Sequence, residues 1–133
     1  MTDQSCPFCE IASSSEDDRI VLENTAGIVI RDKFPVTRGH TLIVPKRHTG
    51  SFFDLASGER DALLDLLDRA KLDIDEEFRP DGYNIGINDG PAAGQTVPHL
   101  HIHLIPRYQS DDSDPRGGVR WIIPDKADYW SEQ

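Results

Sequence analysis

The stretch His99-Leu100-His101-Ile102-His103-Leu104-Ile105 determines both the fold and the chemistry that the sequence predicts. Polar and apolar residues alternate from His99 to Leu104, which is the pattern of a β-strand with one buried face. We therefore predict a strand over residues 99–106, with Leu100, Ile102 and Leu104 in the core and all three imidazoles on the opposite face. Neighbouring histidines would lie about 6.6 Å apart along the strand and the outer two about 13 Å apart, so they cannot all serve one purpose.

Two other interpretations of the histidine run stay open. A solvated strand edge can carry histidines that have no function, and His-x-His on a strand can chelate a catalytic metal ion. The run itself contains no carboxylate, which weakens the metal interpretation without removing it. A metal-dependent hydrolase is therefore one candidate function.

One long amphipathic helix is predicted between residues 55 and 78. Ser57 is the expected N-cap of this helix and Pro80 its stop signal. Apolar residues recur at steps of three or four, as the buried stripe of a helix requires, at Leu63, Leu67, Ala70, Ile74 and Phe78.

Four more short strands are predicted over residues 19–23, 27–31, 40–44 and 83–88, which are rich in β-branched residues and bounded by turn residues. A hairpin loop at residues 24–26 would join the first two. Because the strands come mostly as sequence neighbours with one helix inserted, we predict an α+β fold: an antiparallel five-stranded meander sheet with one long helix. Residues 109–120 are expected to form a loop that leads into an apolar piece at 121–123.

The size and charge of the chain exclude several classes of protein. Its 133 residues are the length of a single domain, predicted over residues 1–133. The formal net charge of −10 disfavours binding to the phosphate backbone, so no nucleic-acid partner is expected. The first five residues lack the basic and apolar regions of a signal peptide, and no apolar stretch is long enough for a membrane span. We therefore expect a cytoplasmic protein without a membrane partner.

A cysteine pair and a glycine-rich segment are further candidates for function. Cys6 and Cys9 form a Cys-x-x-Cys, which in a reducing compartment indicates metal or redox chemistry more often than a structural disulfide. On the strand at 83–88, Asn84, Gly86 and Asn88 would share one face. Glycine lets backbone N–H groups approach an anion, and Asn, Gln and Thr supply neutral hydrogen bonds to phosphate oxygens. A simple glycine-rich turn at residues 90–94 is the alternative.

The segment Gly94-Gln95-Thr96-Val97-Pro98-His99-Leu100-His101-Ile102-His103-Leu104-Ile105-Pro106-Arg107 resembles the signature of the histidine triad (HIT) family of nucleotide hydrolases and transferases. The resemblance extends to residues 39–48 and to Cys6-Pro7-Phe8-Cys9. The tail at residues 114–121 is similar to bacterial members described as diadenosine polyphosphate hydrolases.

The resemblance implies attack at the α-phosphate of a nucleoside conjugate, either a dinucleoside polyphosphate or an AMP phosphoramidate. It makes His101 the nucleophile of a covalent nucleotidyl-histidine intermediate that water hydrolyses, with the second ring nitrogen held by a backbone carbonyl. His103 would hydrogen-bond a phosphate oxygen or the bridging atom. His99 completes the triad, and the upstream His40 would support it.

The resemblance also assigns residues to the nucleotide. Asn88, Gln95 and Thr96 correspond to contacts with the phosphate and the leaving group. Asp32 corresponds to the acid that takes the ribose hydroxyls, as a bidentate acceptor for a vicinal diol. A solvated surface carboxylate is the alternative for Asp32.

A structural zinc ion is the expected cofactor, and no catalytic metal is expected. Cys6 and Cys9 offer two thiolates at a spacing that suits one ion, and a closed site needs two more ligands. His99 lies away from His103, and His48 corresponds to a histidine of zinc-containing bacterial relatives, so Cys6, Cys9, His48 and His99 are the predicted set. A redox-active or idle cysteine pair is the alternative, whereas no zinc-finger spacing is present.

Two expectations about the whole protein follow from the resemblance. Family members commonly dimerise, so a homodimer is expected in which the long helix and the strand at 83–88 supply the interface. The alternative to an enzyme is a nucleotide-binding, zinc-organised sensor or adaptor module with little turnover.

Overall fold

The computed structural model describes residues 5–131. Residues 1–4, on which most of the argument against a signal peptide rests, lie outside the described part. The strands are β1 (Ile20–Glu23), β2 (Gly27–Arg31), β3 (Thr41–Pro45), β4 (Gly82–Ile87) and β5 (Ile102–Arg107). The α-helices are α1 (Pro7–Ala12), α2 (Ser57–Phe78) and α3 (Pro124–Ala127), and the short 3-10 helices are η2 (Phe52–Asp54), η3 (Pro91–Ala93) and η4 (Gly118–Ile122).

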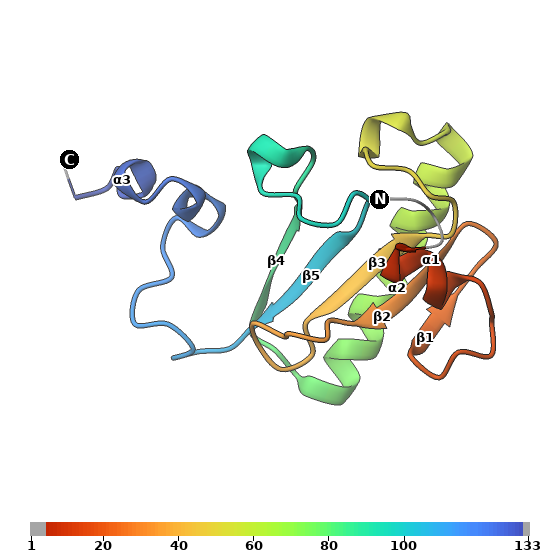
Figure 1. Cartoon of the computed structure of the whole chain (residues 1–133). Helices are drawn as coiled ribbons and strands as arrows, with labels where there is room; N and C mark the ends of the chain where they lie inside the picture. Colours follow the sequence, from red (N-terminus) through yellow and green to blue (C-terminus); the bar gives the residue numbers. More distant parts are fainter. Residues whose placement is uncertain (1–4, 132–133) are drawn as a thin grey trace.

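The five strands form one antiparallel sheet in the order β1-β2-β3-β5-β4 (Figure 1). This confirms the predicted α+β fold with a five-stranded sheet and one long helix. The predicted meander order is wrong in one respect, because β5 and not β4 lies beside β3. Helix α2 returns the chain along the sheet, so β4 runs in the same direction as β3. An antiparallel sheet then requires a strand of opposite direction between them.

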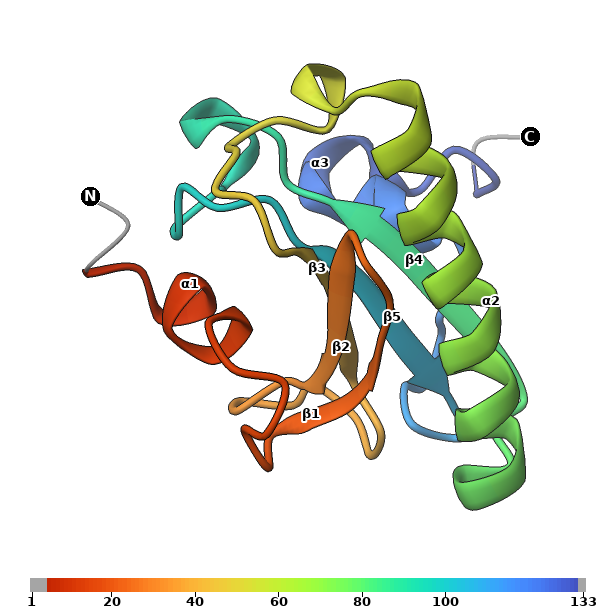
Figure 2. The same cartoon turned by 90° about the vertical axis from the view of Figure 1, so that its right-hand side faces the viewer.

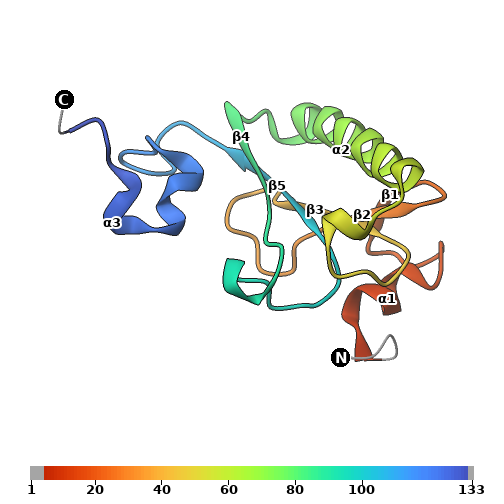
Figure 3. The same cartoon turned by 90° about the horizontal axis from the view of Figure 1, so that it is seen from above.

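Helices cover the two faces of the sheet (Figure 2 and Figure 3). Helix α2 packs on one face and buries Leu63, Leu66, Ala70 and Ile74 against strand residues that include Val29, Ile43, Ile102 and Leu104. Helix α1 packs on the other face, with Phe8 and Ile11 against Ile28, Ile30, Leu42 and Val44. The central strands are therefore buried on both faces, as their nearly continuous apolar sequence requires.

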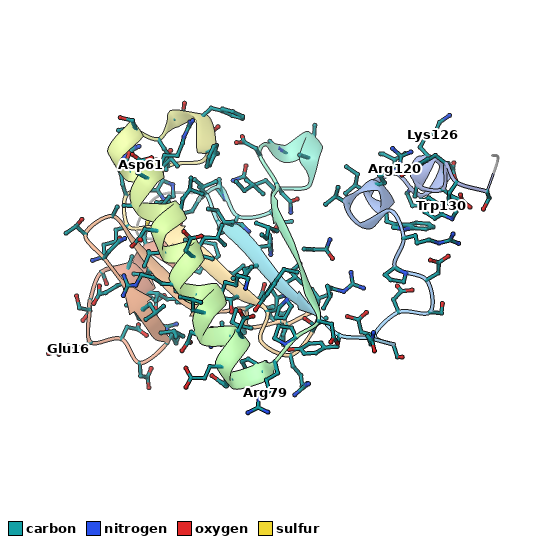
Figure 4. The ribbon with its side chains drawn as sticks, turned by 180° about the vertical axis from the view of Figure 1, so that it is seen from behind. Glu16, Asp61, Arg79, Arg120, Lys126 and Trp130 are labelled. Carbon is teal, nitrogen blue, oxygen red and sulfur yellow. The ribbon has the colours of Figure 1, made fainter. Side chains whose placement is uncertain are left out.

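The ends of α2 differ slightly from the prediction. Ala56, not Ser57, is the N-cap, and Ser57 is the first helical residue. Alanine cannot accept a hydrogen bond through its side chain, so the end is stabilised from inside the helix: the Glu59 carboxylate accepts the Ala56 N–H at 3.0 Å. At the other end Arg79 adopts a left-handed conformation, φ 52°, directly before Pro80 (Figure 4).

The strand that carries the histidine run begins later than predicted. Strand β5 starts at Ile102, so His99 and His101 precede it and the three imidazoles do not share one strand face. Two contacts divert the chain before the strand: the His99 N–H bonds to the Val97 carbonyl at 2.8 Å and the Leu100 N–H to the Thr49 carbonyl at 2.7 Å. The predicted burial nevertheless holds, because Leu100, Ile102 and Leu104 are all in the core on the α2 side.

Strand β4 forms a free edge of the sheet, where Ile85 is 52% exposed. The homodimer implied by the resemblance would use this edge, and it stays a prediction. Within residues 5–131, no helix combines the length and apolar character needed to cross a bilayer.

Gly27 at the start of β2 offers a test of the packing between α2 and the sheet. A Cβ at this position would lie 2.9 Å from the Val44 carbonyl oxygen and 2.5 Å from Leu63 Cδ2. Because the backbone oxygen cannot move aside without breaking the sheet, Gly27→Ala should lower the free energy of unfolding by about 1–3 kcal/mol in urea titrations. Gly58→Ala is the matched control, since nothing lies within 4 Å there. Equal stability of the two variants would contradict the packing described.

Candidate active site

His101 is held in the tautomer that a nitrogen nucleophile needs. Its Nδ1 lies 2.9 Å from the His99 carbonyl oxygen. A carbonyl oxygen can only accept a hydrogen bond, so Nδ1 carries the proton and the lone pair of Nε2 is available for attack. The ring is half-buried and packs against the Phe8 ring of α1, with centroids 5.0 Å apart.

A chain of hydrogen bonds fixes the tautomers of two further histidines, His40 and His103. The Val36 backbone N–H donates to His40 Nδ1 at 3.1 Å, so the ring proton of neutral His40 lies on Nε2. His40 Nε2 then donates to His103 Nδ1 at 3.0 Å. This leaves the proton of His103 on Nε2, where the imidazole can donate to a bound anion.

Both of these histidines are neutral at pH 7. Burial lowers the pKa of His103, the neighbouring His101 and His40 add to this effect, and Asp32 opposes it, so that the resulting pKa is about 4. Burial likewise lowers the pKa of His40, again opposed by Asp32. The pair therefore offers a preorganised donor without a fixed positive charge.

Asp32 faces the histidines and does not extend freely into solvent. Its side chain is 17% exposed, and Oδ2 lies 3.4 Å from His40 Nε2. Oδ1 accepts the Phe34 N–H at 2.8 Å. The carboxylate is thus oriented at the end of β2, beside the cluster that it would serve.

The structure separates the three polar residues that the resemblance assigned to the phosphate. Asn88 follows β4 and lines a cavity together with His40 and His103. Gln95 spans two loops, since its Nε2 donates to the Gly50 carbonyl at 2.9 Å and its Oε1 accepts the Gly90 N–H at 2.8 Å. Thr96 is exposed on the loop that leads to the histidine run. Gln95 therefore shapes the glycine-rich loop, whereas Asn88 lies next to the histidines.

Sequence reasoning missed two groups of this site. Phe8 contacts His101, and its place between the two cysteines was the available signal. The Val36 N–H sets the tautomer of His40, but a backbone contact leaves no signature in the side-chain pattern.

Cys6, Cys9, His48 and His99 form a second cluster, whose ligand atoms all lie within 4.8 Å of one another. His99 Nδ1 lies 3.3 Å from Cys6 Sγ, 3.4 Å from Cys9 Sγ and 3.2 Å from His48 Nδ1. Cys9 Sγ lies 3.1 Å from His48 Nδ1. The structure thus brings together the four predicted metal ligands.

The donor set fits a tetrahedral zinc ion. Zinc bonds of about 2.0 Å to nitrogen and 2.3 Å to sulfur imply tetrahedral edges of about 3.3–3.8 Å, close to the separations found here. His99 Nε2 donates to the Pro45 carbonyl at 2.8 Å, which places the proton there and turns the lone pair of Nδ1 toward the cluster. Ligand type, spacing and tautomer therefore agree.

Asp32, His40 and His103 also place three ligand atoms close together. The Val36 N–H argues against a metal ion in this cluster. A metal on His40 Nε2 would move the ring proton to Nδ1, where it would point at the Val36 N–H. The hydrogen bonds of His40 therefore favour a hydrogen-bonded pair of neutral histidines over a catalytic metal centre in this cluster.

The lowered pKa of His103 predicts a pH dependence of stability. Between its folded pKa of about 4 and the ordinary value of 6.5, the unfolded chain binds more protons, so acidification favours unfolding in this window. We expect His103 to contribute on the order of 1 kcal/mol to the stability lost between pH 7 and pH 5. Urea titrations at both pH values should show a smaller loss for His103→Gln than for wild type. Identical losses would contradict the assignment.

Comparison with known proteins is consistent with this geometry. The HIT domain model matches residues 13–110. An uncharacterized HIT-like protein of Mycoplasma genitalium is 37% identical over 109 residues, covering 82% of this chain and 77% of that protein. A bis(5'-adenosyl)-triphosphatase of Saccharomyces cerevisiae is 40% identical over 97 residues, covering 72% of this chain but only 44% of the yeast protein.

A solved structure matches almost the whole chain. It is a Zn-bound histidine triad family protein from Mycobacterium smegmatis, 34% identical with a TM-score of 0.73, and the match covers 99% of this chain and 100% of that one. The family match, the relatives and the shared fold agree with the resemblance seen in the sequence. The chain belongs to the HIT domain family of nucleotide-binding hydrolases and transferases.

Proposed function

We propose that this protein hydrolyses nucleoside conjugates at the α-phosphate through a covalent nucleotidyl intermediate on His101. The contact between His101 Nδ1 and the His99 carbonyl, 2.9 Å, carries this proposal, because it frees the lone pair that attacks phosphorus. The yeast relative acts on a dinucleoside polyphosphate by its name, but this chain spans less than half of that protein. That name alone therefore does not define the leaving group.

Two displacements at phosphorus make up the reaction. His101 Nε2 forms a bond to the α-phosphorus while the bond to the leaving group breaks. His103 Nε2–H donates to the oxygen or bridging atom on which negative charge develops. Water then displaces His101 and releases the nucleoside monophosphate.

The remaining residues bind and orient the nucleotide. Asp32 would accept the two ribose hydroxyls, since Oδ2 already faces the site. Asn88 would contact the phosphate, together with Thr96, and Gln95 would act indirectly by holding the loop at residues 90–94. His40 would position His103 through their 3.0 Å contact.

The second cluster would hold a structural zinc ion through Cys6, Cys9, His48 and His99. Such an ion supplies binding energy to the folded state and no step of the reaction. It would fasten α1 to the sheet, because Cys6 caps α1 and the His99 ring contacts the Phe8 ring in a T-shaped arrangement, with ring centroids 5.7 Å apart.

Replacing the nucleophile tests the proposed reaction. His101→Ala should abolish turnover and the acid-labile nucleotidyl label on the protein, because the attacking nitrogen is lost. AMP binding by calorimetry should stay within about tenfold, since the phosphate contacts remain. His103→Asn is the comparison variant and should still form the label, more slowly. Turnover near the wild-type rate in His101→Ala would overturn the proposal, and wild-type protein that binds AMP without a label would favour the sensor alternative.

Removing the metal tests the second cluster. Elemental analysis should find about one zinc ion per chain in protein purified without chelator. A content below about 0.2 zinc ions per chain would contradict the proposed zinc site. Cys9→Ser should lose zinc and melt at least about 5 °C lower, whereas Ser13→Ala on the same segment should keep both properties. Chelation should lower the melting temperature before it lowers kcat. Immediate loss of turnover with unchanged melting would instead indicate a catalytic metal.

A further inference from the structure

The four residues of the cysteine-histidine cluster come from three separate parts of the chain. Cys6 and Cys9 belong to one turn at the start of α1, whereas His48 follows β3 and His99 precedes β5. The contact between Cys9 Sγ and His48 Nδ1 joins residues 39 positions apart, and that between Cys6 Sγ and His99 Nδ1 joins residues 93 positions apart. A metal ion held by these atoms therefore cross-links α1 to the loops that flank β3 and β5.

Helix α1 depends on such a cross-link more than α2 does. It has six residues, which is too short for a helix that is stable alone, and it buries only Phe8 and Ile11. These two side chains pack on the face of the sheet opposite α2 (Figure 2). Helix α2 has 22 residues and buries four apolar side chains. The attachment of α1 to the sheet is therefore the weaker of the two.

The two cysteines are also placed to react with each other. Cys-x-x-Cys is the spacing at which disulfide oxidoreductases form and break a disulfide. Here Cys6 is the N-cap of α1, the Cys9 N–H donates to Cys6 Sγ at 3.5 Å, and the two sulfur atoms lie within 4.8 Å of each other. Cys6 is only 1% exposed, whereas Cys9 is partly exposed. An oxidant from solvent therefore reaches Cys9 first and leaves Cys6 beside it to complete a disulfide.

A disulfide and a metal ion restrain α1 in different ways. A cross-link stabilises a fold more when it closes a longer loop of the unfolded chain. The metal ion closes the long loops between α1 and the two histidines, whereas a disulfide between Cys6 and Cys9 closes a single helical turn. Exchange of the ion for a disulfide therefore replaces a bond between α1 and the sheet with a bond inside α1.

We infer that Cys6 and Cys9 are a site of reversible oxidative modification, at which a hydroperoxide converts two zinc-binding thiolates into a disulfide and releases α1 from the sheet. This inference rests on the zinc site of the proposed function. Cys9 Sγ attacks one peroxide oxygen, so that an S–O bond forms, the O–O bond breaks and hydroxide leaves. Cys6 Sγ then attacks the Cys9 sulfur, so that the S–S bond forms and the S–O bond breaks with loss of a second hydroxide. The two thiolates together lose two electrons, which the peroxide gains.

The contacts of Phe8 and His99 define what this modification does to the active site. Phe8 lies between the two cysteines and packs on the His101 ring, with centroids 5.0 Å apart. His99 has two contacts that do not involve the cluster: its Nε2 donates to the Pro45 carbonyl and its backbone N–H to the Val97 carbonyl, both at 2.8 Å. Oxidation therefore removes the Phe8 ring from His101 while the His99 carbonyl stays in place.

Treatment of the zinc-loaded wild-type protein with hydrogen peroxide tests this inference. A chromogenic chelator should record about one zinc ion released per disulfide formed, and both cysteines should become resistant to iodoacetamide. The melting temperature should fall by at least about 5 °C. Amide hydrogen exchange should become faster in residues 7–12 and stay unchanged in residues 57–78, because only α1 is released. Dithiothreitol with added zinc should restore all of these properties.

A variant without cysteines is the control for oxidation elsewhere in the chain. The combined substitutions Cys6→Ala and Cys9→Ala should give a protein that melts at a lower temperature before treatment. Peroxide should not lower that temperature further. Exchange in residues 57–78 of the wild-type protein is the second control, and it does not require the variant to fold.

The outcomes separate this inference from the proposed zinc site. Protein that binds zinc but keeps both the ion and two alkylatable thiols in peroxide would overturn the inference alone. Oxidation of Cys9 to a sulfinic acid that dithiothreitol does not reverse would also overturn it. An equal loss of stability in the variant without cysteines, or faster exchange throughout α2, would show that peroxide acts elsewhere and would overturn it as well. Reduced protein that binds no zinc would overturn the zinc site itself and this inference with it.

Discussion

The position of His99 is the constraint on which both functional clusters depend. Its carbonyl accepts from His101 Nδ1, its Nε2 donates to the Pro45 carbonyl at the end of β3, and its Nδ1 faces Cys6, Cys9 and His48. The residue is fully buried, so each of these polar groups needs its partner. A single residue, His99, therefore couples the orientation of the proposed nucleophile His101 to the anchoring of helix α1.

The chemistry proposed for His40 and His103 depends on keeping both imidazoles neutral where they are shielded from solvent. Desolvation disfavours the imidazolium form, and neighbouring histidines add to that effect. Asp32 opposes it without reversing it. The consequence is a face whose ring nitrogens have defined donor and acceptor roles, set by one backbone N–H and one backbone carbonyl.

Much of the fold could be predicted because burial follows simple periodicities. The period of two placed Leu100, Ile102 and Leu104 in the core, and the helical period placed Leu63, Ala70 and Ile74 there. The start of β5 could not be predicted in this way, because contacts from Thr49 and Val97 divert the backbone while the burial pattern continues. Strand order depends on the direction in which α2 returns the chain, which a local pattern does not contain.

The site was predictable to the extent that it is made of recognisable side chains. The four residues predicted to bind zinc, Cys6, Cys9, His48 and His99, come together as expected, and His40 meets His103. The role of Gln95 was harder to predict, because an amide that binds two loop backbones has the same sequence signature as one that binds a phosphate. The position of η4 beside β4 was not predictable, since it depends on where a C-terminal segment of irregular sequence lies.

The strand order also has a consequence for when the site assembles during folding. β4 and β5 can pair locally, but His40 and His103 approach each other only when β3 pairs with β5 in the register Thr41↔Leu104. That pairing encloses α2, β4 and the glycine-rich loop, so it closes the largest loop of the sheet and carries a correspondingly large entropic cost. In a chain that contained only the local hairpins, no strand pairing would bring His40 and His103 together. The reactive face is therefore completed together with the sheet and not before it.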